Sequence, residues 1–352
     1  MKLFLKDQHI SKFLAFGILL VSSAFVWAKP PLLTNRELLN PPPKVIRTCC
    51  AFGTDLSIAR IPFIKMTDII SLEDVGSHYY LGHKDEINGI IYTRKGGFID
   101  LGHLRDYADY TAYLYTVIRL YAANKSNVVL ELGHEGGHKK LIINSPHEID
   151  SMLLFELAGK IAYDLSLWHE IATWFGCSYV PLIPERYSSF SPEDLYSNLL
   201  GVKLGIQSLK SDLEYNEAMK MVLSETLVKL EAVKTIEETY LAMEQVENIW
   251  WTREKPLPSS KVLLTRYLDS GSSLKPWLLP DETNSYTPHI LDIPDPSLTR
   301  LYQLNIKINR KFPWMTPDSQ NPDRTIDQND FEWFVDHIRN NQKKITPKRT
   351  ES

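Results

Sequence analysis

The stretch from about 145 to 175 constrains the fold most, because it predicts one long helix that is apolar around most of its circumference. Apolar side chains recur there at three- and four-residue spacings. The sequence SPHE at 145–148 has the residues of a helix-capping box, and Gly176 supplies a stop signal after Phe175. Few charged residues remain for a solvent-facing side. We therefore expect a long central helix that is buried in a large core.

The rest of the chain combines further helices with short strands. Of its 352 residues 43% are apolar, which is an ordinary globular composition. The pattern predicts a helix-dominated α+β fold, with one large domain over 46–342 and small β-hairpins. Helical spacing recurs over about 103–123, after a capped start at 191–194, over about 213–250 and over about 328–341. Strand-like runs cover 89–93, 98–101 and 301–308.

Both ends of the chain differ from this domain. Residues 1–28 begin with scattered lysines, continue with the apolar run FLAFGILLVSSAFV and end with small residues before a cut after Ala28. That order is typical of a secretory signal peptide, so we expect a periplasmic or secreted protein, with an uncleaved anchor as the alternative. Residues 29–45 form a proline-rich lead-in, and residues 343–352 form a basic tail. No second apolar run reaches the roughly 20 residues of a membrane span, so no transmembrane segment is expected after cleavage.

Charge and cysteine content narrow the class of protein. The formal net charge of −4 argues against a nucleic-acid-binding protein. In an oxidising compartment Cys49 or Cys50 is expected to form a disulfide with the distant Cys177, because a bridge between neighbouring cysteines is strained. One thiol is left over, and we interpret it as a small buried side chain rather than a nucleophile.

The hexamer GHEGGH at 133–138 contains the H-E-x-x-H pattern of zinc proteases. That pattern binds zinc only on a helix, where the two histidines share one face. Here two adjacent glycines occupy the middle positions, and each costs about 1 kcal/mol in a helix interior. The flanking runs NVVLEL and KKLIIN favour strands. The hexamer is therefore predicted to be the tip of a β-hairpin.

Two other stretches place polar residues on helices that should be buried. In GGFIDLGHLRDYADYT (96–111), His103, Asp106 and Asp109 lie at three-residue intervals near the start of a helix. In WHEIATWFG (168–176), His169 and Glu170 lie in the last turns of the central helix. Taken singly, the first acids fit helix capping, and the second pair fits a satisfied core histidine beside an ion-paired glutamate.

Taken together, the two stretches predict a metal centre if the two helix ends meet. They then provide two imidazoles and two carboxylates, enough for a catalytic zinc ion with an activated water. His103 and His169 are the expected metal ligands, and Asp106 and Glu170 are the expected catalytic carboxylates. Less central candidates are His78 and His83 in a loop, and Asp194 and Asn198 at the next helix start.

Other chemistries have weaker support. The sequence contains no serine-nucleophile elbow, phosphate-binding loop or dinucleotide fingerprint. A carboxylate pair of Asp106 and Glu170 would also suit glycoside hydrolysis, with Trp168 as a sugar platform. A thiol mechanism would pair Cys177 with His169, eight residues earlier.

Four strings give the chain a wider resemblance, namely RTCCAFG (47–53), GGFIDLGHLRDYADYTAY (96–113), HEIATWFG (169–176) and SFSPEDLYSNLLG (189–201). With these, most of the chain resembles a bacterial domain-of-unknown-function family, number 4056. The resemblance implies an exported protein of the bacterial envelope and carries over no catalytic residue. The expected function is a metal-dependent hydrolase acting on a cell-envelope substrate such as peptidoglycan, a peptide or a lipid. The alternative is a non-catalytic envelope protein that binds glycan or a protein partner.

Overall fold

The structure is a computed structural model. It describes residues 29–34, 37, 47, 51–56, 58, 67–178, 185–269, 271–313 and 323–345. The predicted signal peptide, most of the lead-in and residues 346–352 of the basic tail lie outside the described residues. Within the described ranges, no helix is both long enough and apolar enough to cross a membrane.

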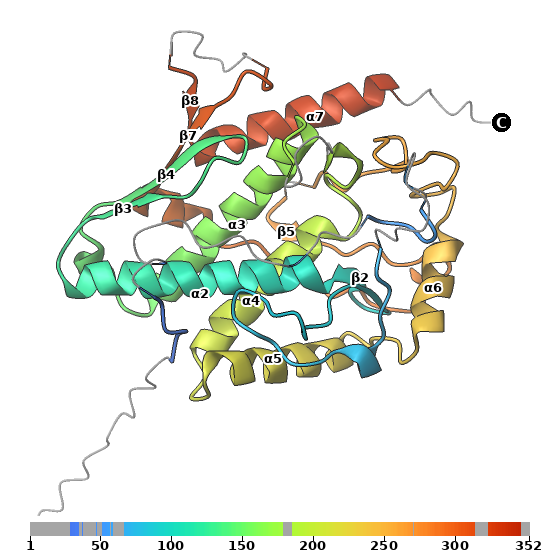
Figure 1. Ribbon diagram of the computed structural model, residues 1–352, viewed down its shortest axis with the longest axis horizontal. Helices are drawn as coiled ribbons and strands as arrows, with labels where there is room; N and C mark the ends of the chain where they lie inside the picture. Colours follow the sequence, from blue (N-terminus) through green and yellow to red (C-terminus); the bar gives the residue numbers. More distant parts are fainter. Residues whose placement is uncertain are drawn as a thin grey trace, which may run out of the picture.

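Three helices form the centre of the molecule: α2 (Leu101–Ala123), α3 (Leu153–Trp174) and α4 (Asp194–Leu209). Each of them packs against the other two (Figure 1). The backbones of α2 and α4 approach closely, since a Cβ atom on Gly201 would lie 2.0 Å from the carbonyl oxygen of Leu104. Along α3 most side chains are buried, among them Trp168 and Ile171. The predicted long, buried central helix is confirmed.

The start of α3 differs from the prediction. Ser145 adopts a left-handed conformation with φ of 47° and its side chain caps nothing, so only the short 3-10 helix η2 (Pro146–Glu148) follows it. The α-helix begins at Leu153, where Asp150 Oδ1 accepts hydrogen bonds from the amides of Met152 and Leu153. The predicted end is correct, because Phe175 is the C-cap and Gly176 has the positive φ of 83° that favours glycine.

The strands form small antiparallel sheets. β1 (Ile90–Thr93) and β2 (Gly97–Asp100) make a hairpin that leads directly into α2. A second hairpin joins β3 (Val128–Glu131) to β4 (Gly137–Ile143), with GHEGGH at its turn, so the prediction of a hairpin in place of a zinc helix is confirmed. β7 (Gln303–Ile308) and β8 (Thr325–Ile326) extend this sheet in the order β3-β4-β7-β8. A short pair joins β5 (Ser273–Leu274) and β6 (Leu291–Asp292).

The helix predicted over 213–250 is two helices, α5 (Tyr215–Lys229) and α6 (Ile236–Gln245). The break has a tertiary cause. Glu231 adopts a left-handed φ of 57°, and the Val233 amide donates to the carbonyl of Tyr92 on β1. The connecting segment thus adds a backbone contact to the first hairpin, and Thr235 then caps α6.

The remaining elements complete one helix-dominated α+β domain, as predicted. The main hydrophobic core joins α2, α3 and α4 to α5, to the four-stranded sheet and to α7 (Phe331–Ile345). A second, smaller core packs around the fully buried Trp251, between the first hairpin and α6. The other short 3-10 helices are η1 (Leu72–Asp74), η3 (Glu185–Tyr187), η4 (Pro280–Glu282), η5 (Pro296–Leu301) and η6 (Gln328–Asp330).

Candidate metal centre

His103 is fixed in the first turn of α2 by the residue that caps this helix. Asp100 ends β2, and its Oδ1 accepts hydrogen bonds from the amides of Gly102 (2.7 Å) and His103 (3.2 Å). The backbone amide of Asp100 donates a hydrogen bond to Ser197 Oγ on α4 at 3.0 Å, which connects the start of α2 to α4. His103 is only 4% exposed, so its imidazole is directed into the protein.

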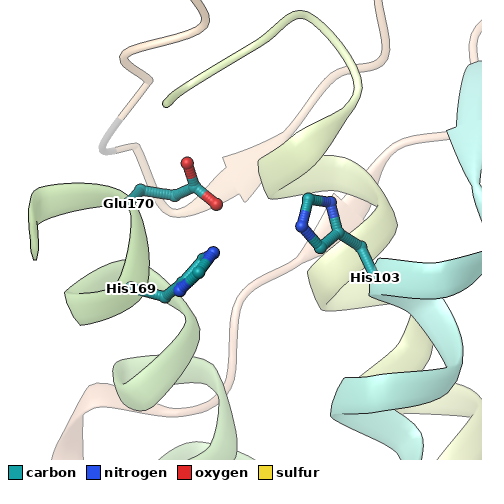
Figure 2. Close-up of side chains that lie close together, drawn as sticks. All are labelled: His103, His169 and Glu170. Carbon is teal, nitrogen blue, oxygen red and sulfur yellow. The ribbon is translucent and has the colours of Figure 1, made fainter. Parts of the chain in front are cut away.

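His169 and Glu170 approach His103 from the last turns of α3. One ligand atom from each of these three residues lies within 4.8 Å of those of the other two. The two imidazole rings are 6.0 Å apart between centroids, and Figure 2 shows all three side chains pointing toward one another. The structure therefore brings together the two helix ends that the sequence hypothesis required to meet.

Each histidine has a carboxylate close to its Nδ1 atom, and for His169 the contact is a hydrogen bond. Nδ1 of His169 lies 2.6 Å from Oε1 of Glu135, and Nδ1 of His103 lies 3.0 Å from Oδ1 of Asp194. Carboxylates beside Nδ1 are typical outer partners of histidines that bind a metal through Nε2. In Figure 2 one ring nitrogen of each histidine faces the space shared with Glu170.

Glu135 comes from the GHEGGH hairpin tip. Its Oε2 accepts from Lys139 Nζ at 3.0 Å, and its backbone carbonyl accepts from Trp168 Nε1 at 2.9 Å. Burial raises the pKa of the Glu135 carboxyl, but Lys139 and His169 outweigh burial and hold that pKa well below its usual range. The hairpin therefore delivers an ionised carboxylate to His169, although it does not bind metal in the manner of a zinc-protease helix.

Glu170 contributes a carboxylate oxygen that lacks a partner. Its Oε2 accepts from the amide of Phe190 at 2.7 Å, whereas Oε1 has no hydrogen-bond partner in the described part of the chain. Glu170 is 1% exposed. Burial raises the pKa of its carboxyl to about 8, with a further contribution from Asp194 and opposing ones from the two histidines. A cation at Oε1 would remove this electrostatic penalty.

Two more buried acids adjoin the histidines at the start of α4. Glu193 and Asp194 are each 1% exposed, and Oε2 of Glu193 has no hydrogen-bond partner among the residues that the structure describes. Burial, together with the charges of Asp194 and Asp100, raises the pKa of Glu193 well above its usual value. Across the described ranges, no lysine or arginine nitrogen comes within 4 Å of a carboxylate oxygen of Glu170, Glu193 or Asp194. We call His103, His169, Glu170 and Asp194 the His103 cluster.

The other predicted catalytic residue, Asp106, is not one of the residues that meet here. Its Oδ1 accepts from Arg47 Nη1 at 2.9 Å, in a separate charge network on α2. Asp194, rather than Asp106, is the carboxylate found at Nδ1 of His103. We call the four buried residues of that network the Arg47 cluster; they are Arg47, His78, Glu86 and Asp109.

The less central candidates are placed as follows. His78 belongs to the Arg47 cluster, and His83 is half-exposed beside Asp85. Asn198 is fully buried in α4, and neither polar atom of its side chain has a hydrogen-bond partner within the described ranges. Cys177 is buried with a free thiol, so the structure gives no support to the predicted disulfide. Its two possible partners, Cys49 and Cys50, lie outside the described residues.

The donor set suits zinc. Two imidazoles and one glutamate are the ligands of one class of catalytic zinc site, which keeps its fourth position for water or substrate. Two surface cavities, of about 500 and 370 Å³, lie away from the His103 cluster. The first is lined by Arg47 and the 82–88 loop, and the second by Trp250, Tyr267 and Trp277.

The comparisons with known proteins agree with the resemblance seen in the sequence. Neither the curated proteins nor the solved structures contain a match to this chain. A family model described as "Protein of unknown function (DUF4056)" matches residues 37–280. That range contains the whole His103 cluster, Glu135 and the Arg47 cluster. Because the match spans more than half of the sequence, the chain belongs to the DUF4056 family.

Proposed function

We propose that this protein is an exported metal-dependent hydrolase that binds one zinc ion through His103, His169 and Glu170. The observation that carries the proposal is the meeting of these three ligand atoms within 4.8 Å, in a largely buried site whose carboxylates form no ion pair with a lysine or arginine of the described ranges. Imidazole nitrogens favour zinc over magnesium or calcium, which prefer oxygen ligands.

The electrostatics of the site support a resident cation. A buried carboxylate without a counter-charge is costly and normally takes up a proton or acquires a cation. Glu170 and Glu193 show this penalty in their raised pKa values. A divalent ion bound to Oε1 of Glu170 would offset the penalty and would also give that oxygen a partner.

The chemistry follows from the ligands and their outer partners. Zinc with an open position activates water at neutral pH and polarises a carbonyl group. Glu135 and Asp194, which lie beside Nδ1 of the two imidazoles, would orient Nε2 toward the ion. The reaction class that fits this arrangement is hydrolysis of an amide or ester.

The envelope location rests on the sequence. Residues 1–28 have the order of a secretory signal peptide, which would place the mature chain in the periplasm or outside the cell. Peptidoglycan peptides, other peptides and lipids are the amide- and ester-containing substrates of that compartment. Among these we propose an envelope amide as the substrate.

The test is zinc-dependent hydrolysis of isolated peptidoglycan fragments by the mature protein, with released products identified by mass spectrometry. Wild type should cleave, and removal of zinc by a chelator or His169→Ala should abolish cleavage. His134→Ala is the matched control, because His134 is an exposed histidine of the hairpin tip and should leave activity unchanged. Cleavage that survives zinc removal would contradict the proposal. Stoichiometric zinc without hydrolysis of any envelope amide would favour the non-catalytic alternative.

A further inference from the structure

Arg186 is an arginine that forms no ion pair with a carboxylate of the described residues. Its guanidinium lies over the ring of Trp174, with the Cζ atom 4.4 Å from the ring centroid. Its Nε is buried without a hydrogen-bond partner, and its side chain pairs with no carboxylate in the described ranges. Burial lowers the pKa of this guanidinium. A partly buried arginine in this condition is suited to bind an anion.

The position of Arg186 links it to the His103 cluster. Trp174 follows Glu170 by four residues on α3, so the two side chains share one face of the helix and are separated by a rise of about 6 Å. Arg186 therefore stacks on a side chain that lies one helical turn beyond Glu170 on the same face of α3.

A second arginine fixes the backbone of this region. Arg266 is 7% exposed and also lies over Trp174, at 5.1 Å. It donates to the carbonyl oxygens of Ser189, Arg186 and Ser260. The backbone amide of Phe190, the residue after Ser189, donates to the carboxylate of Glu170. Arg266 thus connects the backbone at Arg186 to the backbone at Ser189, next to the Phe190 amide that binds Glu170. The hydrogen bonds that Arg266 donates all go to carbonyl oxygens.

Arg253 is an arginine of the same fold whose guanidinium is paired with carboxylates. It also stacks on a tryptophan, Trp251, with its Cζ atom 5.2 Å from the ring centroid. Unlike Arg186, it forms ion pairs with Glu244 and, at 3.1 Å, with Glu247. Stacking on tryptophan therefore does not by itself leave an arginine without a carboxylate.

We propose that Arg186 binds a free carboxylate of the substrate, so that the substrate is an amide that carries a terminal carboxylate. This inference rests on the proposed function and names its substrate class. The planar guanidinium matches a carboxylate through two parallel hydrogen bonds.

The experiment compares binding of N-acetyl-dialanine with binding of its C-terminal amide, by titration calorimetry on zinc-loaded and zinc-free protein. Wild type should bind the free acid at least about tenfold more tightly, as expected for hydrogen bonds between charged groups. Arg186→Ala should reduce this preference to less than about twofold, and Arg186→Lys should retain only part of it. Arg253→Ala is the matched control and should keep the full preference.

The outcomes separate the two proposals. Zinc content, measured by elemental analysis, should be the same in Arg186→Ala and wild type, and circular dichroism checks that the variant is folded. If the protein holds no zinc, the proposed function fails, while the acid–amide preference of the zinc-free protein still reports on Arg186. An equal affinity of wild type for acid and amide overturns the carboxylate subsite, and so does a preference that survives Arg186→Ala. Displacement of the dipeptide by inorganic phosphate at much lower concentration than by acetate would also overturn it, in favour of a phosphoryl group.

Discussion

The Arg47 cluster and the His103 cluster both bury carboxylates against α2, yet only the first contains its own permanent cation. In the Arg47 cluster, Arg47 donates to Glu86 and, at 2.8 Å, to Asp109. Burial raises the pKa of Asp109, but His78 and Arg47 outweigh it and lower that pKa to about 2. In the His103 cluster burial and Asp194 instead raise the pKa of Glu170 to about 8.

The difference shows how to distinguish a structural charge network from a binding site in one molecule. Apart from the partly buried His169, the residues of both clusters are buried, so burial does not separate the clusters. What separates them is whether the protein supplies the counter-charge. A cluster that is complete without a ligand stabilises the fold, whereas a cluster that lacks a cation is suited to bind one.

The largest expected effect comes from removing the cation of the complete cluster. Arg47→Met should lower the free energy of unfolding by about 3–5 kcal/mol, because it leaves Glu86 and Asp109 buried without their partner. Urea denaturation measures this. Arg253→Met, which breaks a half-exposed ion pair, should cost less than about 1 kcal/mol. Similar losses in the two variants would remove the distinction between buried and exposed pairs.

Zinc should stabilise the other cluster by a comparable amount. At a free zinc concentration a hundred times its dissociation constant, the free energy of unfolding of wild type should rise by about 2.7 kcal/mol. His103 is a proposed zinc ligand, so the change should disappear in His103→Ala. Thermal unfolding with and without zinc gives the comparison. A zinc effect of the same size in His103→Ala would place the ion elsewhere.

The pH dependence of stability should reveal Asp109. Its folded pKa of about 2 lies below the ordinary 3.8, so the carboxylate contributes stability above about pH 4. This contribution, about 2.5 kcal/mol, should be lost as the pH falls through 3.8 to about 2. Asp109→Asn should therefore unfold at lower urea than wild type at neutral pH, with the gap closing in acid. Asp85→Asn, at an exposed carboxylate, should show a constant gap near zero. A stability difference between wild type and Asp109→Asn that stays constant down to pH 2 would contradict the low pKa of Asp109.

Glu135 should matter for metal binding more than for folding. Glu135→Gln removes the charged partner of His169 Nδ1 and should weaken zinc binding by about 10–100-fold. Competition with a zinc-binding dye measures the affinity. Glu131→Gln is the matched control, since Glu131 contacts the exposed His138 of the same hairpin at 2.8 Å. The account predicts an unchanged affinity there, and equal losses in both variants would argue against a specific role for Glu135.

The smallest effect is expected at Glu170, whose carboxylate forms no ion pair with a lysine or arginine of the described ranges. In zinc-free protein, Glu170→Gln should change the free energy of unfolding by less than about 1 kcal/mol, because the glutamine oxygen can still accept from Phe190 and no ion pair is lost. Urea denaturation at neutral pH tests this against Arg47→Met. A loss of several kcal/mol would mean that Glu170 already has a cationic partner in the folded chain.

The features that could be predicted from sequence depend mostly on neighbouring residues. Apolar spacing was enough for α2 and for most of α3, and the Gly-Gly pair was enough to recognise the second hairpin. The interrupted helix over 213–250 was missed, because the break depends on a backbone contact between Val233 and β1 that no local pattern encodes. The helix start at Ser145 failed for a related reason, since its capping residues were present but the backbone adopts a left-handed turn.

The candidate site was predictable in its core and not in its surroundings. His103, His169 and Glu170 were identified from unusual polar residues on buried helices. Their partners come from distant parts of the chain, Glu135 34 residues before His169 and Asp194 at the start of α4. Glu135 was dismissed together with the zinc-protease pattern that contains it. Only the folded structure shows that Glu135, at the hairpin tip, contacts Nδ1 of His169.

The most direct test is the zinc content of the purified mature protein, determined by elemental analysis for wild type and for His169→Ala. The account predicts one zinc ion per wild-type chain and a loss of that zinc in His169→Ala, with both proteins folded by circular dichroism. A folded wild-type chain that holds no zinc after incubation with zinc and removal of the excess would contradict the central claim. The same conclusion would follow if His169→Ala kept a full equivalent of zinc.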